Sequence, residues 1–276
     1  MAWQARLTLH ARRAGARCIV HSSHKGPLRV LKTLHPEGDA IAHQVIVHPP
    51  GGVVGGDRLE LQVRLDAGAH LLLTTPGATR FYRSAGDPAW QSVHGALQAG
   101  ARLEWLPLEA IAHSGCIAGN QARFELAAGA EMIGWDLLAL GLPASGEPFA
   151  SGRFTQHLEL PGLWLERGLI DSADALLLNS PLGMAGRSTL LTMWFASGQA
   201  IADARVEALV DAAREHAPEG GADVVAGVTA LQRRVVVLRA LAHRVEPAMA
   251  LARAVRARWR ELAWQLQPTA PRVWGT

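Results

Sequence analysis

Three acidic residues stand inside apolar runs of the sequence, where a carboxylate needs a partner. Glu104 lies in Leu-Glu-Trp-Leu, Asp136 in Ile-Gly-Trp-Asp-Leu-Leu and Glu166 in Leu-Trp-Leu-Glu-Arg. Burying a carboxylate is costly unless it is ion-paired, hydrogen-bonded or bound to a metal ion. Oxygen ligands and water hold a divalent cation weakly enough to release it, so inward-facing carboxylates would suit a polar route that hands a cation on. The alternative is that these side chains face solvent from half-buried strands.

The histidines and cysteines do not form a pattern typical of a metal centre. His21 and His24 would point to opposite faces of a strand, and His113 with Cys116 supplies only two ligands, whereas a structural zinc site needs four. No C-x-x-C or H-E-x-x-H motif occurs among the 12 histidines and two cysteines. We therefore expect no tightly bound metal and no intrinsic cofactor.

A glycine-rich stretch, His-Pro-Pro-Gly-Gly-Val-Val-Gly-Gly-Asp, occupies His48–Asp57. It lacks the Gly-Lys-Ser/Thr ending of a phosphate-binding loop and the G-x-G-x-x-G spacing of a dinucleotide site. We interpret it as a tight structural loop in which backbone passes close to backbone, with Asp57 as a polar site at its end. The residues that define this loop are Pro49, Pro50, Gly51, Gly52, Gly55 and Gly56.

A second distinctive segment, Thr74–Ser84, reads Thr-Thr-Pro-Gly-Ala-Thr-Arg-Phe-Tyr-Arg-Ser. Its Pro-Gly pair favours a turn. Phe81, Tyr82 and Arg83 follow, but no acid or histidine lies close enough in sequence for a nucleophile arrangement. A structural or docking loop is the better interpretation.

The elements that would position these residues form a loose repeat of about 30 residues. Each unit is an alternating run, a turn centred on glycine and a second apolar run, which predicts paired antiparallel strands. Stacking of such units predicts a helically wound, solenoid-like arrangement, with a plain sandwich as the alternative. Glu104 and Glu166 each follow their turn glycine by four residues and would share a face, whereas Asp136 would point the other way. The turn glycines are Gly68, Gly100, Gly129 and Gly162.

The remaining segments complete a mainly β fold with a small C-terminal α+β portion. We expect residues 1–200 to form a β body and residues 201–276 to pack on it within one structural domain. Asp203 would cap a helix that runs through His216, and a last helix would begin near Pro247. Further strands are expected at Trp3–Arg12, Ala16–His24, Leu28–Leu34, Ile41–His48, Val224–Thr229 and Arg234–Leu241.

The composition argues against several classes of function. A net charge of +3 over 276 residues, mostly arginine spread along the chain, argues against a nucleic-acid binder. The N-terminus lacks the apolar core of a signal peptide, and no apolar run approaches the ~20 residues that span a bilayer. Two cysteines do not make a disulfide framework. We expect a cytoplasmic protein that binds neither nucleic acid nor membrane.

These motifs, in this order, resemble the UreD (also called UreH) family of urease accessory proteins along essentially the whole chain. The chain departs from the family at Thr33-Leu34-His35, where an aromatic pair is frequent, and at Gly141-Leu142, where Gly-Arg is frequent. The resemblance is carried by Gly26–Leu28, His35–Glu37, His48–Asp57, Thr74–Ser84, Leu103–Ile111, Trp135–Leu138, Gly146–Phe149, Leu165–Arg167 and Pro271–Trp274.

The resemblance implies a non-enzymatic maturation protein with helically wound strands. Such proteins bind UreF, which recruits the GTPase UreG, and the assembly sits on the urease structural subunits while nickel is delivered to the urease dinickel site. Carried over by motif, Asp57, Thr79, Asp136 and Glu166 are candidates for a polar nickel route, together with Glu104 from its apolar run. Ni²⁺ contacts at Asp136 and Glu166 would be transient.

Three other functions are compatible with the residues alone. A nickel storage or transport protein would bind Ni²⁺ tightly, although no histidine-rich tract supports it. A β-solenoid hydrolase would need paired carboxylates about 5–10 Å apart across a cleft, for which Glu104 and Glu166 are the candidates. A passive interaction module would need no polar route.

Overall fold

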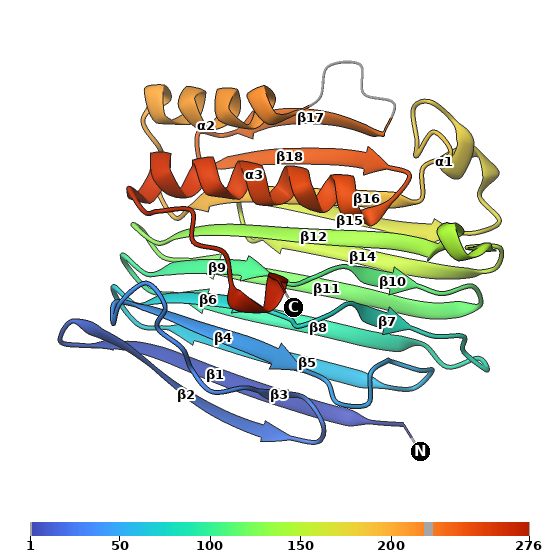
Figure 1. Cartoon of the computed structure of the whole chain (residues 1–276), viewed down its shortest axis with the longest axis horizontal. Coiled ribbons are helices and arrows are strands. Elements are labelled where there is room, and N and C mark those ends of the chain that lie inside the picture. Colours follow the sequence, from blue (N-terminus) through green and yellow to red (C-terminus); the bar gives the residue numbers. More distant parts are fainter. Residues whose placement is uncertain (1, 218–222, 276) are drawn as a thin grey trace.

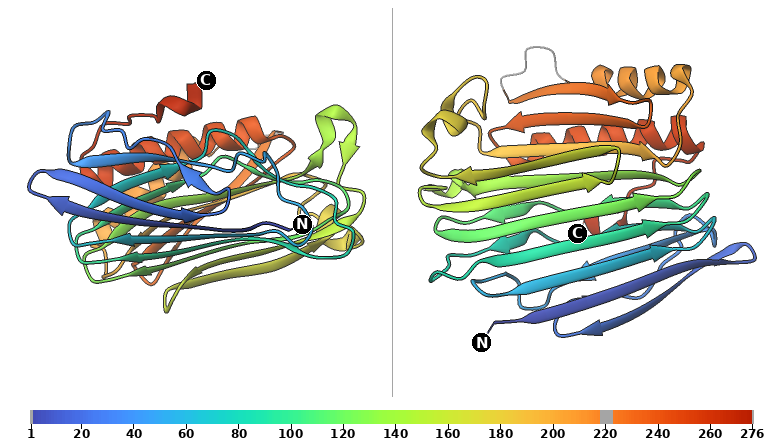
Figure 2. Two further views of the ribbon diagram at one scale, coloured as in Figure 1. Left: turned by 90° about the horizontal axis from the view of Figure 1, so that it is seen from below. Right: turned by 180° about the vertical axis from the view of Figure 1, so that it is seen from behind.

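The computed structural model describes residues 2–217 and 223–275, in which the strands form two facing β-sheets. Figure 1 views the molecule from the side on which the long helix α3 (Val245–Trp264) lies. The right-hand view of Figure 2 shows the opposite side, where the seven-stranded sheet lies in front over the lower part of the face, and strands of the C-terminal portion lie above it. The second sheet has eleven strands and carries the two longest helices on its outer face.

The seven-stranded sheet has the order β15-β14-β11-β8-β5-β1-β2. Its two edges are therefore β15 and β2, and its central strands β5, β8, β11 and β14 run parallel to one another. The strands are β1 (Gln4–Ala14), β2 (Arg17–Lys25), β5 (Arg58–Leu65), β8 (Ala89–Leu97), β11 (Cys116–Leu126), β14 (Gly152–Leu160) and β15 (Trp164–Asp171).

The eleven-stranded sheet follows the order β17-β18-β16-β12-β9-β6-β4-β3; β10 and β13 also pair with β12, and β7 pairs with β10. Strands β4, β6, β9 and β12 are parallel. The strands are β3 (Arg29–Val30), β4 (Ile41–Val47), β6 (His70–Thr74), β7 (Thr79–Phe81), β9 (Arg102–Leu106), β10 (Ala110–Ala112), β12 (Glu131–Leu142), β13 (Glu147–Pro148), β16 (Thr189–Ser197), β17 (Val224–Leu231) and β18 (Val235–Ala242).

The chain alternates between the two sheets from β4 to β14, so the predicted solenoid-like winding is confirmed. The predicted hairpins at Gly68, Gly100 and Gly129 are wrong, because the strands on either side of each glycine belong to different sheets. These glycines form corners, each with a positive φ of 69–77°, and they stack closely along the solenoid. Alternating burial on both sides of a glycine fits a corner as well as a hairpin, because both leave each strand with one buried face. The turn at Gly162 is a hairpin, as predicted, and so is the turn at Gly15.

The C-terminal portion continues the larger sheet. Strands β16, β18 and β17 add to β12 in antiparallel order, and α2 (Asp203–His216) and α3 (Val245–Trp264) pack on the outer face. Asp203 is the first helical residue, while the cap position belongs to Ala202 and has no side-chain hydrogen bond, so the expected cap is displaced by one residue. Three short helices complete the described chain: η1 (Pro143–Ser145), α1 (Ala175–Asn179) and η2 (Arg272–Gly275).

Two apolar layers result. One fills the space between the two sheets, and the other lies between the larger sheet and helices α2 and α3, where Ala252, Val255 and Trp259 of α3 are buried. Within the described residues, no helix is both long and apolar enough to cross a membrane. The division of the chain near residue 200 remains a prediction.

Candidate functional site

A row of amide side chains crosses the interior of the seven-stranded sheet. Gln91, Asn120 and Gln156 pair directly in register on the adjacent parallel strands β8, β11 and β14. Gln91 Nε2 donates a hydrogen bond to Asn120 Oδ1 at 3.4 Å, and the row reaches Gly168 on β15. Three adjacent polar residues facing an otherwise apolar interior call for polar partners on the opposite sheet.

A matching row crosses the inner face of the eleven-stranded sheet. Asp136 on β12, Thr192 on β16 and Arg239 on β18 pair in register, and Gly227 on β17 ends the row. The two rows meet at Asp136, whose carboxylate accepts hydrogen bonds from Asn120 Nδ2 at 2.6 Å and from Gln156 Nε2 at 2.5 Å. Together with Glu166, these residues form what we call the polar seam: Gln91, Asn120, Gln156, Asp136, Thr192, Glu166 and Arg239.

Asp136 is buried, and no cationic side chain among the described residues forms an ion pair with it. Burial raises the pKa of this carboxyl to about 6, the charge of Glu166 adds to the increase, and the amide hydrogen bonds of Gln156 and Asn120 offset part of it. The carboxylate is therefore held by neutral donors and has a second carboxylate as its charged neighbour.

Glu166 forms the outer end of the polar seam. The Thr192 hydroxyl donates to Glu166 Oε1 at 2.9 Å, and Arg239 Nε donates to Glu166 Oε2 at 2.6 Å. The Glu166 side chain is 19% exposed and that of Arg239 is 53% exposed. The seam thus runs from a fully buried carboxylate to a half-exposed ion pair at the surface.

The polar seam ends at Gln91 beside a pocket of about 220 Å³. Gln91 and the candidate Thr79 both line it, as do Gly51 and Gly52 of the glycine-rich loop and the preceding His48. The two loops singled out in the sequence therefore frame a cavity next to the row of amides. Thr79 belongs to this pocket and not to the seam itself.

Asp57 organises the glycine-rich loop. Its carboxylate accepts hydrogen bonds from the backbone N–H groups of Trp3 at 2.7 Å and Val54 at 3.0 Å, and it is buried. Both oxygens are thereby occupied by the loop and by the N-terminal segment. The structure places Asp57 outside the polar seam, where it holds the loop that borders the pocket.

Comparison with known proteins identifies the family. The family model of the UreD urease accessory protein matches residues 4–275. The chain is 55% identical over 278 residues to a protein of Leptothrix cholodnii and 53% identical over 274 residues to one of Polaromonas sp., covering 99–100% of each chain, and both are named urease accessory protein UreD. A third relative with that name, from Methylibium petroleiphilum, is 56% identical over 297 residues with full coverage of both chains. The chain belongs to the UreD family.

As a UreD family member it is a urease accessory protein, and its relatives are named for that role and not for a catalysed reaction. Within residues 2–217 and 223–275, no three His, Cys, Asp or Glu side chains gather into a group able to hold a metal ion. Any cation that enters the polar seam of this UreD chain would meet two carboxylates together with amide and hydroxyl oxygens. That donor set binds late first-row transition-metal ions less firmly than clusters of thiolate and imidazole do.

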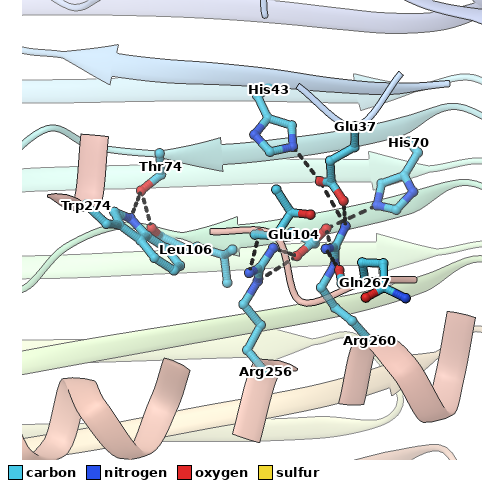
Figure 3. Close-up of polar contacts among 11 residues, drawn as sticks. Glu37, His43, His70, Thr74, Glu104, Leu106, Arg256, Arg260, Gln267 and Trp274 are labelled. Atoms are coloured by element: carbon cyan, nitrogen blue, oxygen red, sulfur yellow. Dashed lines mark hydrogen bonds and ion pairs between the residues drawn. The ribbon is translucent and has the colours of Figure 1, made fainter. Parts of the chain in front are cut away.

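Glu104, the remaining acidic candidate, lies outside the polar seam. It projects from β9 toward α3, where its carboxylate pairs with Arg256 Nε at 2.8 Å, Arg260 Nε at 3.2 Å and His70 Nε2 at 3.3 Å (Figure 3). Burial acts to raise the pKa of Glu104, but Arg256, the His70 hydrogen bond and Arg260 together hold it well below its usual range. Glu37 pairs with the same Arg260 at 2.8 Å. This network anchors α3 to the sheet.

The expectation that Glu104 and Glu166 share one face is therefore wrong. The Gly162 turn is a hairpin within the seven-stranded sheet, so Glu166 lies on the other sheet from Glu104. Asp136 does point away from Glu104, as its spacing predicted, because it lies three residues beyond the position that pairs with Glu104 on β9. The proposed hydrolase pair, Glu104 with Glu166, does not face a shared cleft.

Sequence reasoning did not find Gln91, Asn120, Gln156, Thr192 and Arg239. A weak signal existed for two of them, because Gln91 and Asn120 each precede their turn glycine by nine residues. Equal spacing in successive solenoid units places side chains in one aligned row. Thr192 and Arg239 lie outside the repeat, and nothing in their local sequence marks them.

We expect Gly52→Ala to destabilise the loop pair that borders the pocket. A Cβ at Gly52 would lie 2.1 Å from Cε2 of Tyr82, whose ring stacks on His113 with 4.8 Å between centroids. Displacing the ring should lower the free energy of unfolding by about 1–3 kcal/mol, read from urea unfolding of the full-length chain. Gly77→Ala is the control, because a Cβ at Gly77 meets nothing within 4 Å. Equal unfolding midpoints for the two variants would contradict this packing.

We expect Asp136→Asn to stabilise the fold at neutral pH. Because the pKa is about 6 in the folded protein against an ordinary value of 3.8, the native state holds this proton more tightly, and stability falls as pH rises between those values. Above pH 6 the ionised carboxylate costs about 3 kcal/mol, at ~1.36 kcal/mol per pKa unit. The neutral amide avoids this cost, since Gln156 can turn its own amide over and accept from the new NH₂. The gain in unfolding midpoint should be clear at pH 7.5 and absent at pH 4.

Proposed function

We propose that this UreD family member holds the other urease maturation proteins against apo-urease in the cytoplasm and offers Ni²⁺ a polar route through its interior. UreF would bind it directly and would recruit the GTPase UreG. Nickel is cargo in this proposal and not a resident cofactor. The observation that carries it is the buried carboxylate of Asp136, which has no cationic partner among the described residues.

An uncompensated buried carboxylate is a cost that folding alone does not explain. Proteins neutralise such groups by protonation, by ion pairing or by metal binding. A divalent cation beside Asp136 would replace the missing countercharge, and the nearby Glu166 carboxylate would add to the attraction. The pKa of Asp136, raised to about 6, still lies below neutral pH, so the carboxylate is mostly ionised there and can attract a cation.

The donor set supports transit and not storage. The polar seam supplies carboxylate, amide and hydroxyl oxygens, and it contains no thiolate or imidazole. Imidazole and thiolate hold Ni²⁺ more tightly than these oxygen donors do. Asp136, Thr192 and Glu166 form a series from the interior to the surface, as a route requires.

Exposed apolar side chains support the scaffold role. Leu165 and Leu169 on the edge strand β15 are 57% and 52% exposed, Leu176 on α1 is 78% exposed, and Leu182 is fully exposed. Large apolar side chains that gather on a surface are typical of proteins that function in complexes. Leu165 and Leu169 lie on an edge strand, and Leu176 and Leu182 follow it in the chain, which fits a protein that works with partners.

The test is a strain carrying a complete urease gene cluster, with and without the gene for this chain. We expect the deletion strain to hold normal amounts of urease protein that is inactive and poor in nickel, with both properties restored by the returned gene. Fully active, nickel-loaded urease in the deletion strain would refute the maturation role. Tight stoichiometric Ni²⁺ binding by the isolated chain would favour a storage protein instead.

A further inference from the structure

The outer end of the polar seam carries one guanidinium, and it pairs with the less buried of the two carboxylates. Arg239 bonds to Glu166, whereas Asp136 keeps only its amide donors. Arg239 reaches this position from β18, next in register to Thr192. Its side chain is about half exposed, so the positive charge stands between the buried part of the seam and solvent.

The positions beside this ion pair carry no side chains. Gly168 ends the amide row on β15, and Gly227 pairs with Arg239 on β17. A Cβ added at either glycine would meet nothing within 4 Å. Open space therefore lies on both sides of the Glu166–Arg239 pair, at the level where the polar seam reaches the surface.

The two members of the pair are not held equally. Glu166 is fixed at its second oxygen by the Thr192 hydroxyl and is mostly buried. Among the described residues, Arg239 forms its ion pair and side-chain hydrogen bond with Glu166 alone, and exposed ion pairs contribute little to stability because water replaces them readily. Arg239 can leave while Glu166 stays in place.

We propose that Arg239 is a removable electrostatic plug: its guanidinium occupies the cation position at Glu166 and swings into solvent when a divalent cation takes that position. This inference rests on the function proposed above. Competition by the guanidinium keeps the affinity of the seam for the cation low, and the returning charge favours release. Arg239 is thus a positioning residue that controls how firmly the two carboxylates hold an ion.

The test measures Ni²⁺ binding to the full-length chain by equilibrium dialysis at pH 7.5. Removing one positive charge in contact with the site should strengthen binding, so we expect Arg239→Gln to lower the Kd at least about tenfold. Arg239→Lys keeps the charge and should stay within about twofold of the wild type. The matched control is Arg6→Gln, whose partner Glu60 forms an exposed pair at 2.6 Å on the seven-stranded sheet. An unchanged Kd for Arg239→Gln would overturn the plug.

A double variant tests whether the tighter Ni²⁺ binding occurs at the polar seam. Adding Asp136→Asn to Arg239→Gln should cancel the tighter binding, because the ion loses one of its two carboxylates. If the gain persists in the double variant, the extra ion binds elsewhere and the plug is overturned. Failure of the plug and failure of the proposed function are separable: the dialysis concerns Arg239 in the chain alone, whereas nickel delivery is read from urease in cells.

Discussion

Replacing Asp136 with asparagine is expected to leave urease inactive and poor in nickel while the accessory complex still assembles. The substitution keeps the volume of the side chain and removes the more deeply buried of the two carboxylates in the polar seam. Asp136 touches neutral amides only, so the interior remains satisfied after the change. Loss of a charge–charge interaction in a buried site costs several kcal/mol, and each ~1.36 kcal/mol is tenfold, so urease nickel should fall at least about tenfold.

The measurement is nickel per urease active site, together with urease activity, in cells that carry the variant gene in a complete cluster. Glu166→Gln should produce the same defect in weaker form, because Glu166 is partly exposed and shares its charge with Arg239. Glu60→Gln on the outer face is the control and should be silent. Normal nickel content with Asp136→Asn, with the complex intact, would eliminate the polar route and leave a passive docking role.

This expected loss of function contrasts with the expected gain in stability at neutral pH. Both follow from one feature, a carboxylate kept ionised in a place that disfavours its charge. Functional sites commonly retain such destabilising groups because replacing them removes the activity. A variant that is more stable and yet inactive would be direct support for a cation-handling role of Asp136, since a purely structural residue would lose stability when replaced.

The three acidic residues show which features of the candidate site the sequence predicts and which it does not. All three lie in apolar runs, and the rule that a buried carboxylate needs a partner applies to each of them. The rule does not say which partner. Glu104 forms ion pairs with two arginines of α3, 152 and 156 residues away, whereas Asp136 accepts hydrogen bonds from amides only. Local sequence cannot distinguish these outcomes, because the partners come from elements distant in the chain.

The winding of the strands shows the same limit. The spacing of the turn glycines predicted stacked units correctly, since equal repeats must bury their faces on one another. It did not predict whether a glycine closes a hairpin or a corner, because burial alternates in both. Gly162 closes a hairpin and Gly129 a corner, and this difference moved Glu166 to the sheet opposite Asp136. The polar seam exists because of that change of sheet.

The largest effect on stability is expected from Glu104→Gln. The carboxylate lies fully buried between Arg256 and Arg260, so neutralising it leaves two buried guanidinium groups short of negative charge. Breaking a buried ion pair from one side costs about 3–5 kcal/mol, because the remaining charge is uncompensated. At ~2–4 °C per kcal/mol for a chain of this size, the melting temperature should fall by about 6–20 °C. Glu60→Gln, in an exposed pair, should change the melting temperature little.

A double-variant cycle shows whether the loss comes from uncompensated charge. Arg256→Gln alone should also be strongly destabilising, but the two substitutions together should cost clearly less than their sum, since the pair is then neutral on both sides. Arg260 would keep Glu37 as its partner in the double variant. Strictly additive losses would mean that packing of α3, and not charge pairing, sets the cost. Because Glu104 faces α3 and Asp136 faces the seam, Glu104→Gln should lower stability without changing the pH dependence that Asp136 causes.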